Sequence, residues 1–360
     1  MPDSLPQHTS TRKVAMARII ELDKPDDEIG KTLSRSFQSA HVSFLIGSGA
    51  SQPAIPTAGG IEQEIADLFE AGREDEARFR MYEFLASIQG PMNKLIEEED
   101  DDLNNRSLEN YRRYLESVET ILSERRTDIL PKQATIFTTN YDLFIEKASE
   151  GHLALRLNDG FTRLPRLDSR MEYSSRTFFN ATYNTGNLYE YRVEVPSINL
   201  VKLHGSISWK KEGDDVLFSV RKRDLLPAGR TPDDIKAFNE SYAVVLPQTT
   251  KFRTTLMERT YYELLRIYAN ELDRENALLV AFGFSFGDDH IFDITRKALK
   301  NPTLKLVTFA FNEADRDAFA AKFEGHNNVD IVGPPAGEQI DFQRFNGKLA
   351  RCLPKAEETR

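Results

Sequence analysis

Short runs of apolar residues recur along this chain, and each run ends abruptly at glycine or polar residues. Continuous apolar runs of this kind are typical of strands that are buried on both faces of a parallel sheet. Strands that alternate with helices predict an α/β fold, here a Rossmann-like doubly wound parallel sheet with helices on both faces. The strands are expected at residues 42–46, 134–138, 199–203, 277–282, 304–309 and 329–332. Helix spacing of apolar residues predicts helices at 61–71, from about 142, at 288–299 and after each of the last two strands.

The same pattern divides the chain into regions. Residues 1–15 are polar and aperiodic, so we expect a flexible leader followed by a single domain over 16–360. A charged helical insertion is expected at about 74–126, with an exposed bend at its acidic run, residues 97–102. This insertion is either an assembly surface or, as is commoner for amphipathic helices, a layer that completes the core. A second insertion at about 150–195 shows little periodicity and predicts a loop-rich small subdomain that could close over a site.

Composition narrows the classes of function. The chain has 47 Lys and Arg against 57 Asp and Glu, so its formal net charge is −10 at pH 7. Such a surface repels a phosphate backbone, and we do not expect direct nucleic-acid binding. The single cysteine, Cys352, cannot form a disulfide or a cysteine-based zinc site within one chain, so we expect a tail or core residue. The polar start and the short apolar runs predict neither a secretion signal nor a membrane span, and we expect a cytoplasmic protein.

A glycine-rich segment, Gly47 to Ser51, directly follows the first predicted strand. Glycines at this place let the backbone approach a pyrophosphate, while a nearby helix N-terminus supplies N–H donors. A plain tight turn is the alternative, because the next helix begins late, after Pro53 and Pro56. The segment therefore suggests a dinucleotide site without establishing one.

Polar residues also follow the second and third predicted strands. Asn140 and Asp142 come after the second, at the edge where α/β sheets bind ligands, although either residue could instead cap the next helix. His204 comes after the third and could act as a general base near neutral pH, whereas a lone histidine is more often structural. Gly205 favours the catalytic interpretation, because a glycine would clear space for a substrate beside the imidazole.

The later strands end in comparable groups. Gly283 and Ser285 offer backbone and hydroxyl donors, and Asn312 and Glu313 could read ribose hydroxyls or an adenine edge. The acidic segment 288–290 is interpreted as the start of a helix rather than as the metal site of a nuclease. Polar groups thus gather at four predicted strand ends.

Taken in this order, the motifs resemble those of the sirtuin-like family, in the form typical of its bacterial anti-phage defence branch. The similarity spans about residues 40–335 and is most specific in the string 138–142 (Thr-Thr-Asn-Tyr-Asp) and the His-Gly pair at 204–205. The resemblance implies that Asn140, Asp142 and His204 act in catalysis. It also implies that NAD contacts Gly47, Ser48, Gly49, Ala50, Ser51, Pro56, Thr139, Tyr141, Gly283, Ser285 and Asn312.

Two departures from the family pattern matter. Protein deacylases of this family usually carry a four-cysteine zinc module, which a chain with one cysteine cannot form, so no structural zinc is expected. The deacylases also follow Ile-Pro with Asp-Phe-Arg, whereas Pro56 is followed here by Thr-Ala-Gly. Both departures disfavour deacylation and leave NAD itself as the substrate.

The resemblance therefore implies a NAD glycohydrolase that cleaves NAD to nicotinamide and ADP-ribose and depletes NAD during phage infection. It further implies a homo-oligomer, with a HerA-type ATPase as a candidate partner. A module that senses NAD or ADP-ribose without turnover is the alternative from another class, and a NAD-dependent deacylase or ADP-ribosyltransferase is a third. The presence of both Asn140 and His204 argues for turnover, since a sensor needs no base.

Overall fold

The structure is a computed structural model that describes most of the chain. It covers residues 16–57, 60–125, 129–151, 154–162, 167, 169–185, 192–212, 215–244 and 256–352. The predicted leader lies outside the described residues, as do parts of the two predicted insertions. These parts are residues 1–15, residue 126 of the first insertion, and residues 152–153, 163–166, 168 and 186–191 of the second.

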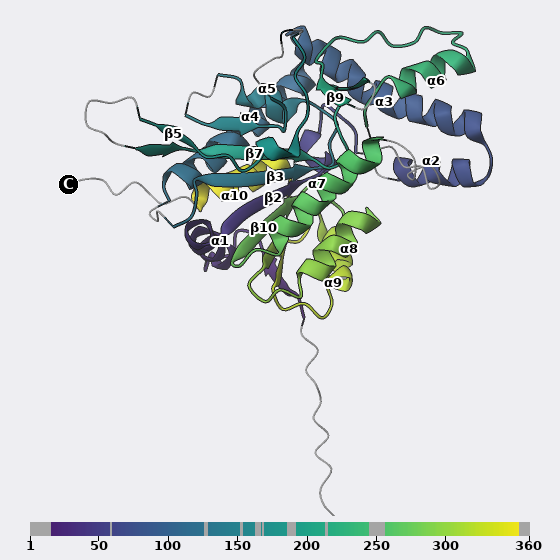
Figure 1. Cartoon of the computed structure of the whole chain (residues 1–360). Helices are drawn as coiled ribbons and strands as arrows, with labels where there is room; N and C mark the ends of the chain where they lie inside the picture. The colour runs from purple at the N-terminus through teal and green to yellow at the C-terminus, as the bar shows by residue number, and fades with distance from the viewer. Residues whose placement is uncertain are drawn as a thin grey trace, which may run out of the picture.

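The centre of the molecule is an eight-stranded sheet in which all neighbouring strands run parallel (Figure 1). In spatial order, the strands are β1 (Arg18–Glu21), β12 (Val329–Gly333), β11 (Lys305–Phe309), β10 (Ala277–Phe282), β2 (His41–Ile46), β3 (Gln133–Thr138), β7 (Ser197–Lys202) and β4 (Arg156–Asn158). All six predicted strands are present within two residues of their expected bounds. The predicted doubly wound α/β fold is confirmed.

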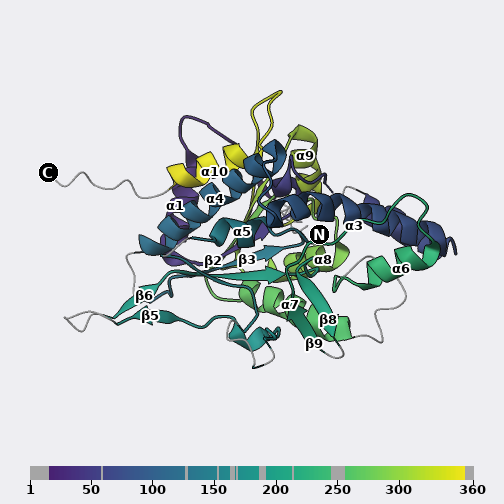
Figure 2. The ribbon, with the colours of Figure 1, turned by 90° about the horizontal axis from the view of Figure 1, so that it is seen from above.

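Helices cover both faces of this sheet. Successive side chains of each central strand therefore enter two different cores, one on each face. Phe44 of β2 and Val280 of β10 enter one core, whereas their neighbours Leu45 and Leu279 enter the other. The first face is covered by α1 (Glu28–Ser39), α4 (Asp102–Ser123), α5 (Phe144–Ser149) and α10 (Phe342–Arg351). The second face is covered by α7 (Leu256–Leu272), α8 (Asp289–Ala298) and α9 (Glu313–Lys322). Figure 2 shows α4 and α10 on one side of the sheet and α7 on the other.

The predicted helical insertion consists of α3 (Glu74–Ile96) and α4, joined by a bend. The acidic side chains 97–100 at this bend are exposed, as expected for a solvated turn. Helix α4 completes the core, because Tyr111 and Tyr114 on it are fully buried. Helix α3 projects beyond the sheet and packs with α2 (Ile61–Glu70) and α6 (Pro232–Glu240) (Figure 1).

The loop-rich region contains short elements that the apolar pattern did not predict. Besides β4, these are η2 (Ser175–Thr177) and the antiparallel pair β5 (Thr182–Asn184) and β6 (Val193–Val195), followed by a second pair, β8 (Trp209–Glu212) and β9 (Asp215–Phe218). Aromatic rings pack this region: Phe161 meets Tyr173 and Trp209 edge to face, with centroids 5.6 and 5.7 Å apart, and Tyr173 and Trp209 are tilted against each other at 5.3 Å. Within the described residues, no helix is both long enough and apolar enough to cross a bilayer.

Candidate active site

Predicted site residues from four adjacent strands lie along one edge of the sheet, because these strands run in the same direction. Strands β10, β2, β3 and β7 lie side by side, so their carboxyl ends form one edge. From this edge rise the loops that carry Gly283, Gly47, Asn140 and His204. After β2 the chain adds β3 and β7 along one edge of β2, and it later adds β10 along the other edge. The strand order therefore reverses between β2 and β10, and open α/β sheets bind ligands at such a switch point.

The glycine loop forms a short 3-10 helix, η1 (Ser48–Ser51), and packs tightly against the loop after β10. A Cβ added to Gly47 would lie 2.3 Å from the carbonyl oxygen of Gly283. A Cβ added to Gly49 would lie 2.9 Å from the Cα of Gly283. The Gly49 N–H donates to this same carbonyl at 3.0 Å. These glycines therefore allow the loops after β2 and β10 to pack against each other, and this role does not depend on a ligand.

Asn140 and Asp142 belong to a buried group of polar side chains that we call the Asn140 cluster: Ser51, Tyr111, Asn140 and Asp142. The Asn140 amide donates to the Gly47 carbonyl and to Ser51 Oγ, both at 3.0 Å, and lies 3.3 Å from Tyr111 Oη. Ser51 Oγ donates to Asp142 Oδ2 at 2.6 Å and lies 2.9 Å from Tyr111 Oη. The cluster joins η1, α4 and the loop after β3 into one network.

Proton positions in this cluster follow from its chemistry. Burial and the nearby Asp142 carboxylate raise the pKa of Tyr111 well above its ordinary value, so its hydroxyl keeps its proton. Because the Ser51 proton goes to Asp142, Tyr111 donates to Ser51. The Asn140 carbonyl oxygen, by contrast, has no hydrogen-bond partner among the described residues and is fully buried. An unpaired buried acceptor of this kind is costly unless a ligand or water supplies a donor.

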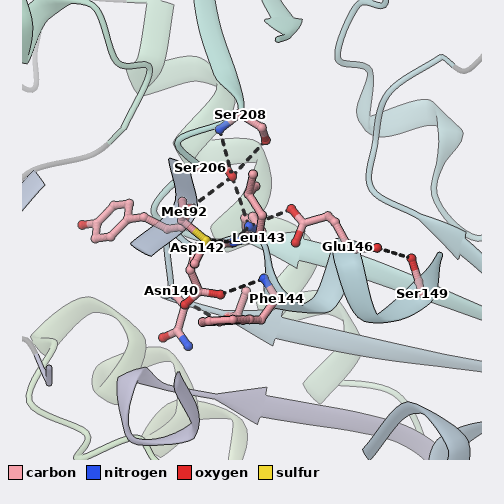
Figure 3. A network of polar contacts seen from close by, with 12 residues as sticks. Met92, Asn140, Asp142, Leu143, Phe144, Glu146, Ser149, Ser206 and Ser208 are labelled. Carbon is pink, nitrogen blue, oxygen red and sulfur yellow. Dashed lines mark hydrogen bonds and ion pairs between the residues drawn. The ribbon is translucent and has the colours of Figure 1, made fainter. Parts of the chain in front are cut away.

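Only one of the two residues contributes to the start of the next helix. Asp142 Oδ1 accepts from the backbone N–H of Phe144, the first residue of α5, at 3.2 Å, so Asp142 supports the start of that helix (Figure 3). Asn140 bonds to the glycine loop instead, and its backbone N–H donates to Thr138 Oγ1 at 3.0 Å. Asn140 is therefore placed by tertiary contacts rather than by the helix.

A buried lysine links the loop of Asn140 to the loop of His204. Lys202 Nζ, at the end of β7, donates to the Asp142 backbone carbonyl and, at 3.1 Å, to Ser206 Oγ. It also forms an ion pair at 2.8 Å with Glu146 of α5, a residue labelled in Figure 3. Burial raises the pKa of Glu146, although the lysine charge opposes the shift. The ammonium group of Lys202 thus contacts α5, the loop of Asn140 and the loop of His204.

His204 is buried at the end of β7 and contacts Asp288, the acidic residue that caps α8. Its Nε2 lies 3.0 Å from Asp288 Oδ2. The rings of Tyr141 and Tyr261 have their centroids 6.2 Å from that of the imidazole. The histidine therefore lies near two tyrosine rings, with a carboxylate at one nitrogen.

The interpretation of Gly205 as space for a substrate is wrong. Gly205 has a φ of +82°, and a Cβ added to it would lie 2.6 Å from the Ala243 carbonyl oxygen. The backbone at Val244 bridges to Gly205, so the space is already filled by protein. Glycine is needed here for the left-handed backbone and for this close approach.

The remaining predicted contacts are distributed unevenly. Tyr141 is buried, with its ring packed edge to face on Phe84 at 5.8 Å, whereas Pro56 and Ser285 are exposed. Asn312 caps α9, and its side-chain oxygen accepts from the Asp315 N–H at 2.9 Å. Thr139, Ser48 and Gly49 are half-buried, and Gly47, Ala50 and Ser51 are buried.

Three residues that contact the site escaped prediction as site residues: Tyr111, Lys202 and Asp288. Asp288 does begin α8, as predicted, because its Oδ1 accepts from the Ile291 N–H at 2.9 Å. That role fully explains an aspartate in the sequence and conceals its contact with His204. Tyr111 lies on a charged helix, where an aromatic residue signals only core packing.

Cys352 is a core residue, as expected. It is 4% exposed, and burial raises the pKa of its thiol to about 11, so the thiol stays protonated near neutral pH. Among the residues that the structure describes, no group of three or more His, Cys, Asp or Glu side chains is placed to hold a metal ion.

One family model and a solved structure are similar to this chain. The family described as "SIR2-like domain" matches residues 134–332, a range that holds Asn140, His204 and Asp288 but not the glycine loop. A crystal structure of a Sir2 homolog–NAD complex is 10% identical, with a TM-score of 0.46 over 94% of this chain and 97% of that chain. No curated protein matches the chain. The family match extends over more than half of the chain, which therefore belongs to the SIR2-like domain family.

Proposed function

We propose that this protein is a NAD glycohydrolase that cleaves NAD to nicotinamide and ADP-ribose. The observation that carries the proposal is the convergence of two kinds of group at the switch point of a SIR2-like fold. At the end of β3 lies the Asn140 amide, whose carbonyl oxygen has no hydrogen-bond partner among the described residues. A histidine paired with a carboxylate lies at the end of the adjacent β7.

NAD would lie across the carboxyl ends of the central strands. Its pyrophosphate would rest over η1, whose loop reaches the switch point between β2 and β10. The Asn140 carbonyl oxygen would accept a hydrogen bond from a ribose hydroxyl or from the attacking water, which satisfies the unpaired acceptor. The Asp142 carboxylate, held by Ser51, would orient nicotinamide or stabilise positive charge.

The reaction needs little acid catalysis. The bond between the ribose C1′ and the nicotinamide nitrogen breaks, and its electron pair returns to the pyridinium ring, which leaves as neutral nicotinamide. Positive charge develops on the ribose as an oxocarbenium ion, as in other glycosyl cleavages. A water oxygen then bonds to C1′, and His204 takes the proton that the water loses. The sum is NAD and water giving nicotinamide, ADP-ribose and one proton.

We further propose that the enzyme acts as a NAD-depleting effector of anti-phage defence, that it works as a homo-oligomer, and that a HerA-type ATPase is a candidate partner. The support for these points is the resemblance of the motifs at residues 138–142 and 204–205 to the defence branch. A NAD-dependent deacylase is disfavoured by the single cysteine, which cannot build the usual zinc module.

The test is incubation of the purified protein with NAD and chromatography of the products. Wild type is expected to release nicotinamide and ADP-ribose in equal amounts, and His204→Ala to slow release about 10²- to 10⁴-fold. His326→Ala is the matched control, because His326 precedes β12 and so lies at the opposite edge of the sheet. Equal turnover by wild type and His204→Ala would contradict the mechanism. Binding of NAD without turnover, also in the presence of the candidate ATPase, would favour the sensing module.

A further inference from the structure

We propose that Asp288 is a positioning residue for His204: it holds the imidazole in the form whose Nδ1 is the basic nitrogen. The inference rests on the proposed function for its catalytic consequence and on geometry for the contact itself. His204 Nε2 and Asp288 Oδ2 are 3.0 Å apart, and both side chains are largely buried, with 7% and 16% exposed.

The carboxylate fixes which ring nitrogen carries the hydrogen. An ionised carboxylate only accepts hydrogen bonds, so the Nε2 that faces it must donate. In the neutral ring the lone pair then belongs to Nδ1, which is the atom able to take a proton from water or a ribose hydroxyl. Asp288 thus selects both the orientation and the tautomer of the base.

The ionised state of Asp288 has its own physical support. Burial by itself would raise the pKa of Asp288, but the hydrogen bond and charge of His204, together with the Ile291 N–H, hold that pKa below its ordinary value. The carboxylate also caps the N-terminus of α8, where the helix dipole favours negative charge. A carboxylate is therefore present at neutral pH.

The loop that carries Asp288 is firmly anchored, so the contact does not depend on a loose side chain. Lys322 of α9 donates to the carbonyls of Ser285, at 3.0 Å, and Phe286, at 2.6 Å. The Phe286 ring is buried edge to face against Phe319 and Phe323. Since α8 begins directly after this loop, the loop and the helix both fix the position of Asp288.

The variant Asp288→Asn separates the two roles of the carboxylate. An asparagine is as good a helix cap as aspartate, so α8 should keep its start. The Ile291 N–H can only donate, and the amide oxygen must therefore stay with it. The amide NH₂ is then left facing His204 Nε2, which can accept only if the ring hydrogen moves to Nδ1.

The experiment is NMR of protein labelled with ¹⁵N-histidine, recorded at about pH 9, well above the ordinary histidine range. The His204→Ala spectrum assigns the His204 signals. We expect the Nε2–H tautomer in wild type and the Nδ1–H tautomer in Asp288→Asn. Asp341→Asn is the matched control, because Asp341 makes the same kind of cap on α10, accepting from the Arg344 N–H at 2.8 Å. An unchanged His204 tautomer in Asp288→Asn would overturn the inference.

Kinetics supply the second measurement. Asp288→Asn is expected to lower kcat about 10²- to 10⁴-fold with little change in KM, while Asp341→Asn keeps the wild-type kcat. A switched tautomer with unchanged kcat would overturn the positioning role. If wild type releases no nicotinamide at all, the proposed function fails, whereas the tautomer experiment still decides the contact between Asp288 and His204.

Discussion

The Asn140 cluster and the His204–Asp288 pair lie at neighbouring strand ends, but they are held in place in different ways. Every member of the cluster bonds to at least one other member, and the network spans three elements. The pair joins His204 to Asp288, the residue that caps α8. Loss of one cluster member leaves other buried polar groups without a partner, which costs stability, whereas the pair holds the imidazole in place for chemistry. Substitutions should therefore affect stability more at the cluster and catalysis more at the pair.

The largest expected effect comes from Lys202→Met, which removes the link between the two regions. This change leaves Glu146 buried without its partner, and breaking a buried pair typically costs about 3 to 5 kcal/mol. Urea unfolding measures the loss. Lys210→Met is the control, because its pair with Glu212 is well exposed and should be worth less than about 1 kcal/mol. If Lys202→Met loses no more unfolding free energy than Lys210→Met, Lys202 does not link the two regions.

The next effect tests whether the loops after β2 and β10 depend on each other. Gly283→Ala places a Cβ 2.8 Å from the Ala50 nitrogen on a backbone with φ of +65°. The combined strain should cost about 2 to 3 kcal/mol in the free energy of unfolding. Gly325→Ala has the same backbone handedness, with open space around the added Cβ in the described structure, and should cost about 1 kcal/mol. Equal losses would show that the loops are not tightly packed.

Two tyrosines on α4 sharpen the comparison within the cluster. Tyr111→Phe removes a hydroxyl that bonds to Ser51 and should destabilise the protein by about 1 to 2 kcal/mol. Tyr114 is equally buried, but its hydroxyl has no hydrogen-bond partner among the described residues. Tyr114→Phe should therefore be neutral or slightly stabilising. Thermal unfolding of the two variants gives the answer, and the opposite order would contradict the network.

The smallest effect concerns the pair and its dependence on pH. The folded pKa of Asp288 is lowered relative to its ordinary value of 3.8, so its contribution to stability is present above that value. The contribution is lost as pH falls through the lower folded pKa. The difference in unfolding free energy between wild type and Asp288→Asn should thus shrink below about pH 4. A difference that grows on acidification would have the wrong sign.

The central strands could be predicted because they are buried on both faces and read as continuous apolar runs. The edge strands could not: β1 has four residues of which only Ile20 is buried, and β4 has only three. Helix α1 did carry a signal, since Ile29, Leu33 and Phe37 recur every four residues after the cap Asp27. Short elements at an edge gain little from burial, so their sequences record little of it.

The placement of the candidate site residues along the sheet was predictable, but their contacts were not. Parallel strands bring their carboxyl ends together, and this alone made Asn140 and His204 neighbours. Tyr111 and Tyr114 look alike in sequence, and only the tertiary packing decides which hydroxyl reaches Ser51. Asp288 already had a sufficient role as a helix cap, so nothing local pointed to His204.

The pairing of β2 with β10 has a consequence for the order in which the chain folds during synthesis. Strand β2 meets β3 on one side, but its other partner, residues 277–282, emerges much later. Until then one edge of β2 has no strand from its own chain, and an uncovered edge readily pairs with other polypeptides. Contacts between such distant segments also form slowly. A nascent chain that stops before β10 should therefore bind chaperones or aggregate. The loops after β2 and β10 can meet only late in synthesis.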